Sequence, residues 1–178
     1  MMDKNVVPKK LIWVDLEMTG LNPATDRILE VAVVITDFEF KELATYEAII
    51  KQPDAVLANM NEWATRQHAI SGLTQKVHNG RDETEVVGEI AQLIREQFGD
   101  EPAILAGNSI HQDRAFIRQW WPDVDALLHY RMLDVSSLKI LMQGKYGQFY
   151  EKPEVHRAKD DIEASIAELE HYLKLLSN

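Results

Sequence analysis

The alternation of hydrophobic and polar positions predicts a sheet of five strands. Runs rich in apolar and β-branched residues, the types that favour strands, occupy residues 11–17, 28–36, 45–51, 103–107 and 130–135. Only a short corner at 38–41 separates the second run from the third. Because short connections join antiparallel neighbours, we expect the first three strands to form an antiparallel meander.

Helical spacing of apolar residues dominates the second half of the chain. Apolar positions three or four residues apart predict helices over 83–98, 113–121, 136–142 and 161–176. Residues 61–68 have helical character, and loops are expected from Gly72 onward and at 144–153. Three early strands followed by alternating helices and strands predict an α/β domain, with a mixed sheet flanked by helices.

Length and composition limit the kind of protein that this is. The 178 residues suffice for one domain, which we expect to span 1–178 with residues 1–9 as a flexible tail. No apolar run approaches the length of a membrane span, and Asp15 interrupts the first apolar run too early for a signal peptide. The chain has no cysteine and therefore neither disulfides nor a thiolate metal site. A reducing, cytoplasmic location is the simplest expectation.

The net charge of −10 narrows the range of nucleic-acid substrates. Proteins that hold long polyanions gain affinity from Lys and Arg contacts to many phosphates. This chain has 19 basic residues against 29 acidic ones and no dense basic run. A nucleic-acid substrate would therefore be short and held by a few local contacts.

Two carboxylates lie close together at the end of the first strand. Asp15 and Glu17 are two residues apart, and residues with that spacing point to the same face of a strand. Burial of two adjacent carboxylates is costly unless a positive charge lies between them, and a divalent metal with oxygen ligands provides that charge. The alternative is that Glu17 lies past the strand end and is merely solvated. Acidic residues downstream favour the metal site.

Three more titratable residues lie near predicted helix starts. Asp113 opens one helix, where an aspartate commonly caps the N-terminus. Asp160, next to Asp161, is placed to cap the last helix together with Glu163. The helix dipole favours the ionised form of an acid at such a position, which suits a metal ligand equally well. His156 precedes Asp161 by five residues, on a loop that can place an imidazole over a carboxylate-held metal.

Together these residues resemble those of a known family. Asp15-x-Glu17, the mid-chain Asp113 and the pair His156-x-x-x-x-Asp161 are similar to the motifs of the DEDDh 3′→5′ exonucleases, which have a ribonuclease H-like fold. Within that family, the segments that resemble oligoribonucleases are 15–21, 107–113, 129–137 and 158–162. The resemblance runs from about residue 10 to the C-terminus.

The resemblance implies an exoribonuclease that releases nucleoside 5′-monophosphates from the 3′ end of short single-stranded RNA. Substrates of two to five nucleotides are implied, with dinucleotides preferred. The implied ligands of two divalent metal ions, Mg²⁺ or Mn²⁺, are Asp15, Glu17, Asp113 and Asp161. His156 is the implied general base, and its ordinary pKa near 6.5 suits proton transfer near neutral pH.

The same resemblance assigns substrate contacts position by position. Leu21 resembles a leucine that wedges between the two bases of a dinucleotide. Trp63 and His68 lie where the family places residues against the 3′ nucleotide, although a core position for Trp63 is an equally good interpretation. The implied grip on the 5′ phosphate, here called the phosphate cap, consists of Ser109, Arg131 and Ser136, with Lys139 placed to assist. A closed phosphate cap would favour very short substrates.

The resemblance also implies a homodimer, in which Tyr130 reaches the site of the other subunit. The sequence itself identifies no dimer interface. Trp120 and Trp121 are candidate apolar anchors, since Trp is enriched at interfaces, and burial of one or both in the core is the favoured alternative. His111 lies inside a motif segment and has no assigned role.

Three other functions compete with this interpretation. A proofreading or RNA-trimming exonuclease of the same superfamily would need a groove open beyond two nucleotides, which the phosphate cap argues against. A non-catalytic oligonucleotide-binding module would lack a metal ligand or the general base, and none is missing. A structural Ca²⁺-binding domain would explain the acidic residues but neither His156 nor Arg131.

Overall fold

A mixed five-stranded sheet organises the fold. The computed structural model describes residues 8–151 and 158–176, and the strands lie in the order β3-β2-β1-β4-β5. The first three, β1 (Lys10–Met18), β2 (Ile28–Asp37) and β3 (Glu42–Ile49), pair antiparallel. On the other side of β1, β4 (Ala103–Gly107) and β5 (Leu128–Asp134) pair parallel. The predicted mixed sheet, with an antiparallel meander first, is therefore confirmed.

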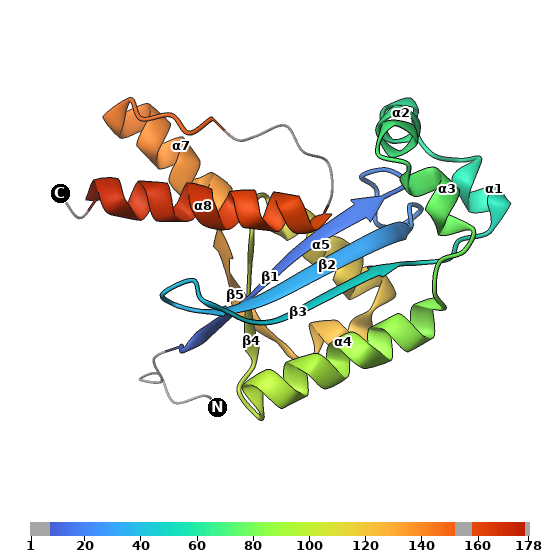
Figure 1. The fold of residues 1–178 in the computed structure, drawn as a ribbon, viewed down its shortest axis with the longest axis horizontal. Coiled ribbons are helices and arrows are strands. Elements are labelled where there is room, and N and C mark those ends of the chain that lie inside the picture. Colours follow the sequence, from blue (N-terminus) through green and yellow to red (C-terminus); the bar gives the residue numbers. More distant parts are fainter. Residues whose placement is uncertain (1–7, 152–157, 177–178) are drawn as a thin grey trace.

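Helices cover both faces of the sheet and one of its ends (Figure 1). One face carries α7 (Val135–Tyr146) and α8 (Ala158–Leu176). The opposite face carries α4 (Glu83–Phe98), α5 (His111–Trp120) and α6 (Pro122–Asp125). At the end where β1 finishes lie α1 (Asp54–Leu57), α2 (Glu62–Ile70) and α3 (Leu73–Val77). None of the helices in the described ranges is long and apolar enough to cross a membrane.

The alternation of side chains along β1 determines where the acidic residues point. Ile12 and Val14 pack into the core on the α4 side, whereas Trp13 packs into the core on the α8 side. Successive side chains of a strand point to opposite faces. Asp15 and Glu17 therefore share the face of Trp13, over which α8 lies.

Two helices begin earlier than the sequence pattern predicts. α5 starts at His111 after Ile110, which makes no side-chain cap, so Asp113 lies inside the first turn and the capping interpretation is wrong. α8 starts at Ala158, so Asp160 and Asp161 lie in its first turn and Asp160 does not cap it. The first turn of α5 is polar, and that of α8 has Ala158 as its only apolar residue, so both turns extend the helix beyond the apolar stripe on which the prediction rests.

Other boundaries differ for local reasons. Part of the loop expected after Gly72 is the short helix α3, and Gly72 precedes it in a left-handed conformation with φ of 73°. α7 continues to Tyr146, into the loop predicted at 144–153, and ends at Gly147 with φ of 63°. A left-handed glycine is a common helix C-terminus because it lacks the Cβ that would clash.

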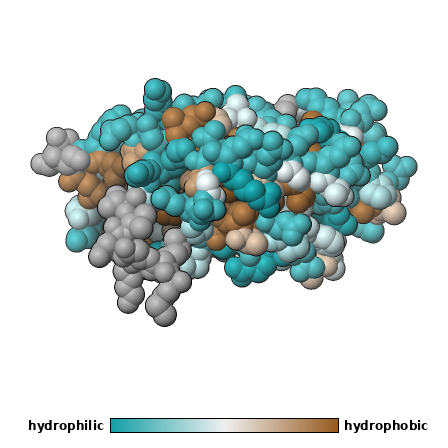
Figure 2. Space-filling view, turned by 90° about the horizontal axis from the view of Figure 1, so that it is seen from below, coloured by the Kyte–Doolittle hydropathy of each residue, from teal (hydrophilic) through white to brown (hydrophobic). Residues whose placement is uncertain are grey.

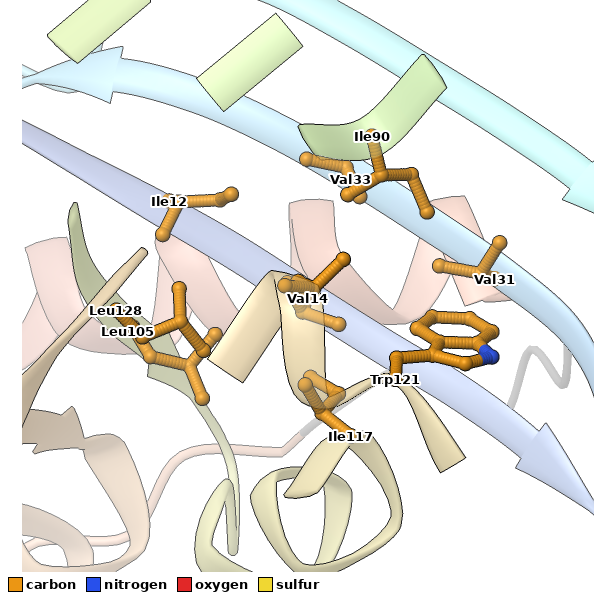
Figure 3. Close-up of a pocket in the computed structure, with 10 residues that line it drawn as sticks. Ile12, Val14, Val31, Val33, Ile90, Leu105, Ile117, Trp121 and Leu128 are labelled. Carbon is orange, nitrogen blue, oxygen red and sulfur yellow. The ribbon is translucent and has the colours of Figure 1, made fainter. Parts of the chain in front are cut away.

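The core on the α4 side is closely packed. Side chains from β1, β2, β4, β5, α4 and α5, together with Trp121, point toward a common void (Figure 3) of about 10 Å³, which is at the lower limit for one water molecule. Trp121 is buried, and its indole N–H donates to Glu83 at 3.0 Å, so the core interpretation is confirmed for this residue. Trp120 is half-buried, with the Arg27 guanidinium 3.9 Å from its ring centroid.

The surface over α4 contrasts with this core. Seen from that side, the molecule is largely hydrophilic, with hydrophobic residues in small, separate groups (Figure 2). Scattered exposed apolar residues are normal for a folded protein.

Substitution of Leu105→Ala tests the packing around the void. Leu105 is fully buried and lines the void, so its loss enlarges a space that the surrounding strands prevent from collapsing. We expect the free energy of unfolding, measured by urea denaturation, to fall by about 2–5 kcal/mol. Leu43→Ala on the exposed edge strand β3 is the matched control, with an expected change within about 0.5 kcal/mol. Equal losses in both variants would contradict the packing described here.

Candidate active site

Three carboxylates meet where β1 ends beneath the first turn of α8. One ligand oxygen from each of Asp15, Glu17 and Asp161 lies within 4.8 Å of the other two, and all three side chains are partly buried. The two strand residues come from one face of β1, as the sequence predicts, and α8 brings Asp161 over that face. The structure thus brings together three of the four predicted metal ligands.

Asp113 approaches the same strand from α5. Its Oδ1 accepts the backbone N–H of Leu16 at 3.0 Å, and the residue is only 8% exposed. Burial raises the pKa of the Asp113 carboxyl well above its ordinary value, and the nearby negative charge of Asp15 raises it further. Asp113 is not one of these three residues, but its carboxylate interacts electrostatically with that of Asp15. An ionised Asp113 therefore requires a positive charge nearby.

The donor set fits hard divalent cations. All four side chains offer oxygen atoms, the ligands that Mg²⁺ and Mn²⁺ prefer. Like charges this close destabilise one another unless a cation is shared. Burial raises the pKa of Asp113 most, and the charge of Asp15 adds to that effect. The residues therefore match a site for divalent metal.

His68 of α2 lies next to Glu17, one of these carboxylates. Its ring is buried, with Nε2 2.8 Å from the carbonyl oxygen of Met18 and Nδ1 3.8 Å from Oε2 of Glu17. A carbonyl only accepts, so Nε2 carries the proton. His68 thus ties α2 to the end of β1 next to Glu17, a contact that the sequence did not predict.

Leu21 projects from a loop that Asp26 holds in shape. The Asp26 carboxylate accepts the Thr19 hydroxyl at 3.0 Å and the backbone N–H of Asn22 at 2.9 Å. A Cβ at Gly20 would lie 2.5 Å from Oδ2 of Asp26, so a larger residue there would displace the carboxylate that holds the loop. Leu21 is exposed and lies on this loop, shortly after the end of β1.

Trp63 lies at the start of α2, where Asn61 caps the helix by accepting the backbone N–H of Ala64 at 2.8 Å. The Trp63 side chain is 57% exposed, so the core interpretation is wrong. An exposed indole held on a capped helix offers a flat apolar face on which a nucleic-acid base can stack.

Trp63→Ala is expected to raise KM for a dinucleotide about 5- to 140-fold, with little change in kcat. Stacking of one base on an aromatic ring is worth about 1–3 kcal/mol, and it binds the substrate before and during the reaction alike. Steady-state kinetics measure the effect. Ile70→Ala, at the exposed far end of the same helix, is the control and should match the wild type. A fall in kcat without a change in KM would contradict the stacking role.

Ser109 and Ser136, two residues of the phosphate cap, lie side by side. Their hydroxyl oxygens are 3.2 Å apart, and the Ser109 N–H donates to both Ser136 Oγ at 2.9 Å and Asp134 Oδ1 at 3.0 Å. Ser109 has a left-handed backbone with φ of 51°, which is uncommon outside glycine and often marks a functional position. Asp134 also caps α7 by accepting the Ser136 N–H at 3.0 Å.

Arg131 and Tyr130 are exposed on the edge strand β5. The Arg131 guanidinium lies 5.2 Å from the ring centroid of Tyr130, and Tyr130 stacks on His129 at 4.5 Å. Arg131 shares the face of Leu133, which packs on the α8 side of the sheet. The side of β5 that bears Arg131 is therefore also the side that bears the carboxylates.

The remaining predicted site residues are placed as follows. The ammonium of Lys139 lies 3.3 Å from Oε1 of Glu168, so Lys139 is already engaged in an ion pair. His111 is exposed, with Nδ1 3.5 Å from Oδ2 of Asp134. His156 lies outside the described residues.

Sequence reasoning missed two polar residues next to the site. Asn108 precedes Ser109 and contacts α8, and Glu168 is fully buried among the apolar residues of α8. A charged residue among the core positions of a helix is the signal that would have identified Glu168. Asn108 lies inside a motif segment in which the resemblance assigns a role to Ser109 and Asp113 but not to Asn108.

Comparison with known proteins finds similar sequences over most of the chain. The exonuclease family RNase_T matches residues 12–169. The oligoribonuclease of Francisella tularensis subsp. tularensis (strain WY96-3418) is 48% identical over 171 residues, covering 94% of this chain and 96% of that protein. The oligoribonuclease of Ectopseudomonas mendocina (strain ymp) is 46% identical over 172 residues, covering 93% of this chain and 94% of the relative.

Solved structures share the fold. A product-bound exonuclease I superposes with a TM-score of 0.71 at 18% identity, covering 91% of this chain and 42% of that one. The zinc-bound complex of E. coli exonuclease I with single-stranded DNA also gives a TM-score of 0.71 at 18% identity, covering 89% and 39%. This chain therefore corresponds to less than half of exonuclease I, and at this identity the likeness shows the fold alone.

Proposed function

The chain belongs to the RNase_T exonuclease family, among its oligoribonucleases, and we propose that it hydrolyses short RNA from the 3′ end to nucleoside 5′-monophosphates. The observation that carries this proposal is the convergence of Asp15, Glu17 and Asp161 at the end of β1. The two serines of the phosphate cap support it, because they suit the 5′ end of a very short substrate.

Two divalent cations, Mg²⁺ or Mn²⁺, would be held by Asp15, Glu17, Asp113 and Asp161. When bound, such ions supply an activated water and stabilise the charge that develops on the leaving oxygen. The protein holds the ligands in place. Asp113 is oriented by the Leu16 N–H, and Glu17 stands against the buried ring of His68. Bound cations would offset the repulsion between these carboxylates.

His156 is proposed as the general base that takes the proton from the attacking water. It lies two residues before Ala158, the first residue of α8, and five before Asp161. Its closeness in sequence to Asp161, one of the clustered carboxylates, supports this proposal. A neutral imidazole accepts a proton near pH 7.

The substrate would lie between Leu21 and Trp63 at its 3′ end and the phosphate cap at its 5′ end. Both apolar side chains are exposed and can enclose two bases. Lys139 is paired with Glu168, so we assign it a supporting role behind the serines. Tyr130 is exposed at the sheet edge and is available to reach a partner's site in the proposed homodimer.

Analysis of products tests the function. A pentaribonucleotide with a 3′-hydroxyl is incubated with Mn²⁺ or with EDTA, beside the same sequence with a 3′-phosphate, and the products are identified by mass spectrometry. We expect nucleoside 5′-monophosphates released one at a time from the 3′-hydroxyl substrate, and no reaction in EDTA. Internal fragments or nucleoside 3′-monophosphates would overturn the proposal, and binding without cleavage would favour the non-catalytic module.

A further inference from the structure

A chain of hydrogen bonds runs inward from the phosphate cap to α8. The Ser136 hydroxyl donates to Oδ1 of Asn108 at 3.1 Å. The other end of the Asn108 amide, Nδ2, donates to Oε2 of Glu168 at 3.1 Å and to Oγ of Ser165 at 2.9 Å. Asn108 directly precedes Ser109, so a single side chain connects both serines of the phosphate cap with the last helix.

The carboxylate of Glu168 fixes the direction of this chain. An ionised carboxylate only accepts hydrogen bonds, so the amide nitrogen of Asn108 faces Glu168 and its oxygen faces Ser136. Ser136 then gives its one hydroxyl proton to Asn108 and accepts the N–H of Ser109 at 2.9 Å. Ser109 is then the donor in the 3.2 Å contact between the two hydroxyls, and its exposed hydroxyl can turn that proton toward a ligand.

Glu168 is held in place from three sides. It is 0% exposed, and its Oε1 accepts the Tyr172 hydroxyl at 2.9 Å and lies 3.3 Å from the ammonium of Lys139. A buried ion pair is often no more stable than apolar residues of the same volume, so stability alone does not explain a carboxylate here. The carboxylate is explained if it serves as a fixed hydrogen-bond acceptor for the Asn108 amide.

The same network reaches the metal ligands. The Ser165 hydroxyl, which accepts from Asn108, donates to the backbone carbonyl of Asp161 at 2.7 Å. The Asn108 amide therefore bonds, through one serine each, to the phosphate cap and to the turn of α8 that carries Asp161. These two places are where the two ends of a dinucleotide would be held.

We propose that Asn108 and Glu168 are positioning residues that fix the separation between the 5′-phosphate site and the acidic cluster, and so set the preference for dinucleotides. The proposal rests on the proposed function. Neither residue touches the substrate. Their effect is to keep Ser109 and Ser136 at one distance from the carboxylates, so that an RNA of two nucleotides fills the space between them.

The test compares two dinucleotides that differ only in the presence of a 5′ phosphate. KM and kcat are measured for the wild type, Asn108→Ala and Ser165→Ala, with Asn59→Ala as the matched control because its amide donates to the Ala55 carbonyl on an exposed helix end. We expect Asn108→Ala to raise KM for the 5′-phosphorylated substrate about tenfold. Its kcat, and KM for the substrate without the phosphate, should change less than about threefold.

Glu168→Gln gives a second, conservative variant. A glutamine oxygen can still accept from Asn108, so we expect a smaller rise in KM for the phosphorylated dinucleotide and no change for the other. Thermal unfolding of each variant accompanies the kinetics, and kcat is referred to folded protein. Ser165→Ala removes the hydrogen bond between Asn108 and Ser165 and keeps the one between Asn108 and Glu168. It therefore replaces Glu168→Gln as the second variant if Glu168→Gln does not fold.

The outcomes separate the two proposals. Equal losses of kcat/KM on both dinucleotides in Asn108→Ala would show a merely structural network and overturn the positioning role. A wild type that prefers the 5′-phosphorylated substrate, with the same preference in Asn108→Ala, would overturn the positioning role alone. A wild type that cleaves neither dinucleotide, or cleaves both equally well, would overturn the proposed function or its phosphate cap, and the positioning role with it.

Discussion

Asp113→Asn is expected to lower kcat by about 10³-fold or more while the protein stays folded. Asparagine has the same shape, and its oxygen can still accept the Leu16 N–H that Asp113 accepts at 3.0 Å. What disappears is a negative charge that helps to hold the cations, whose effect on the transition state is worth several kcal/mol, or about tenfold in rate per 1.36 kcal/mol. Single-turnover cleavage of a dinucleotide in Mn²⁺ measures the loss.

Asp123→Asn on the exposed helix α6 is the matched control for Asp113→Asn and should keep wild-type activity. Circular dichroism establishes that both variants are folded. If Asp113→Asn kept a tenth or more of the wild-type kcat, Asp113 would not be part of the reaction site, and the assignment of four carboxylates would be wrong.

The same substitution is expected to change how stability depends on pH in EDTA. The pKa of Asp113 is raised above its ordinary 3.8 in the folded protein, so the folded state binds more protons than the unfolded state at pH values between the two. Stability must then fall as pH rises through this range. Urea denaturation of the wild type should show that fall, and Asp113→Asn should reduce it. Identical pH profiles would contradict the raised pKa.

His156→Asn is expected to lower kcat by about 10²- to 10⁴-fold, the usual contribution of a general base. In the wild type, log kcat should rise with pH through the His pKa near 6.5, because only the neutral imidazole accepts a proton. The variant should lose that slope. Kinetics over pH 5.5–8.5, a range spanning roughly that pKa, measure both effects.

Two measurements keep the His156 prediction specific. His78→Asn is the control, since His78 is an exposed histidine whose Nδ1 lies 3.4 Å from Oδ1 of Asp54, which is not one of the proposed metal ligands. Calorimetric titration with Mn²⁺ should give the same affinity for the wild type and His156→Asn. A variant that lost metal affinity together with activity would show that His156 is a ligand and not the base.

The parts of this molecule that depend on local periodicity are predictable from the sequence. The period of two along β1 places Asp15 and Glu17 on one face of the strand, and the β-branched runs identify the sheet. Helix starts are less predictable, because the first turns of α5 and α8 are mostly polar and give little apolar signal. For that reason the pattern favours caps at Asp113 and Asp160, whereas both residues lie inside their helices.

Exposure and long-range contacts cannot be derived from the same patterns. Trp63 and Trp121 have the same side chain, yet one is exposed on α2 and the other is buried beneath the sheet. Asn108 meets Ser165 and Glu168, which are 57 and 60 residues away in the chain. Such contacts depend on how α8 lies over β4, which no single segment of sequence specifies.

One comparison tests directly whether this protein is an exonuclease for the shortest RNAs. The quantity is kcat/KM in Mn²⁺ for 5′-phosphorylated RNAs of two, three, five and seven nucleotides, with EDTA as the blank. A groove closed by the phosphate cap predicts the highest value for the dinucleotide and a fall with each added nucleotide. Equal or higher values for the seven-nucleotide RNA would contradict that prediction and indicate a groove open beyond Ser109 and Ser136.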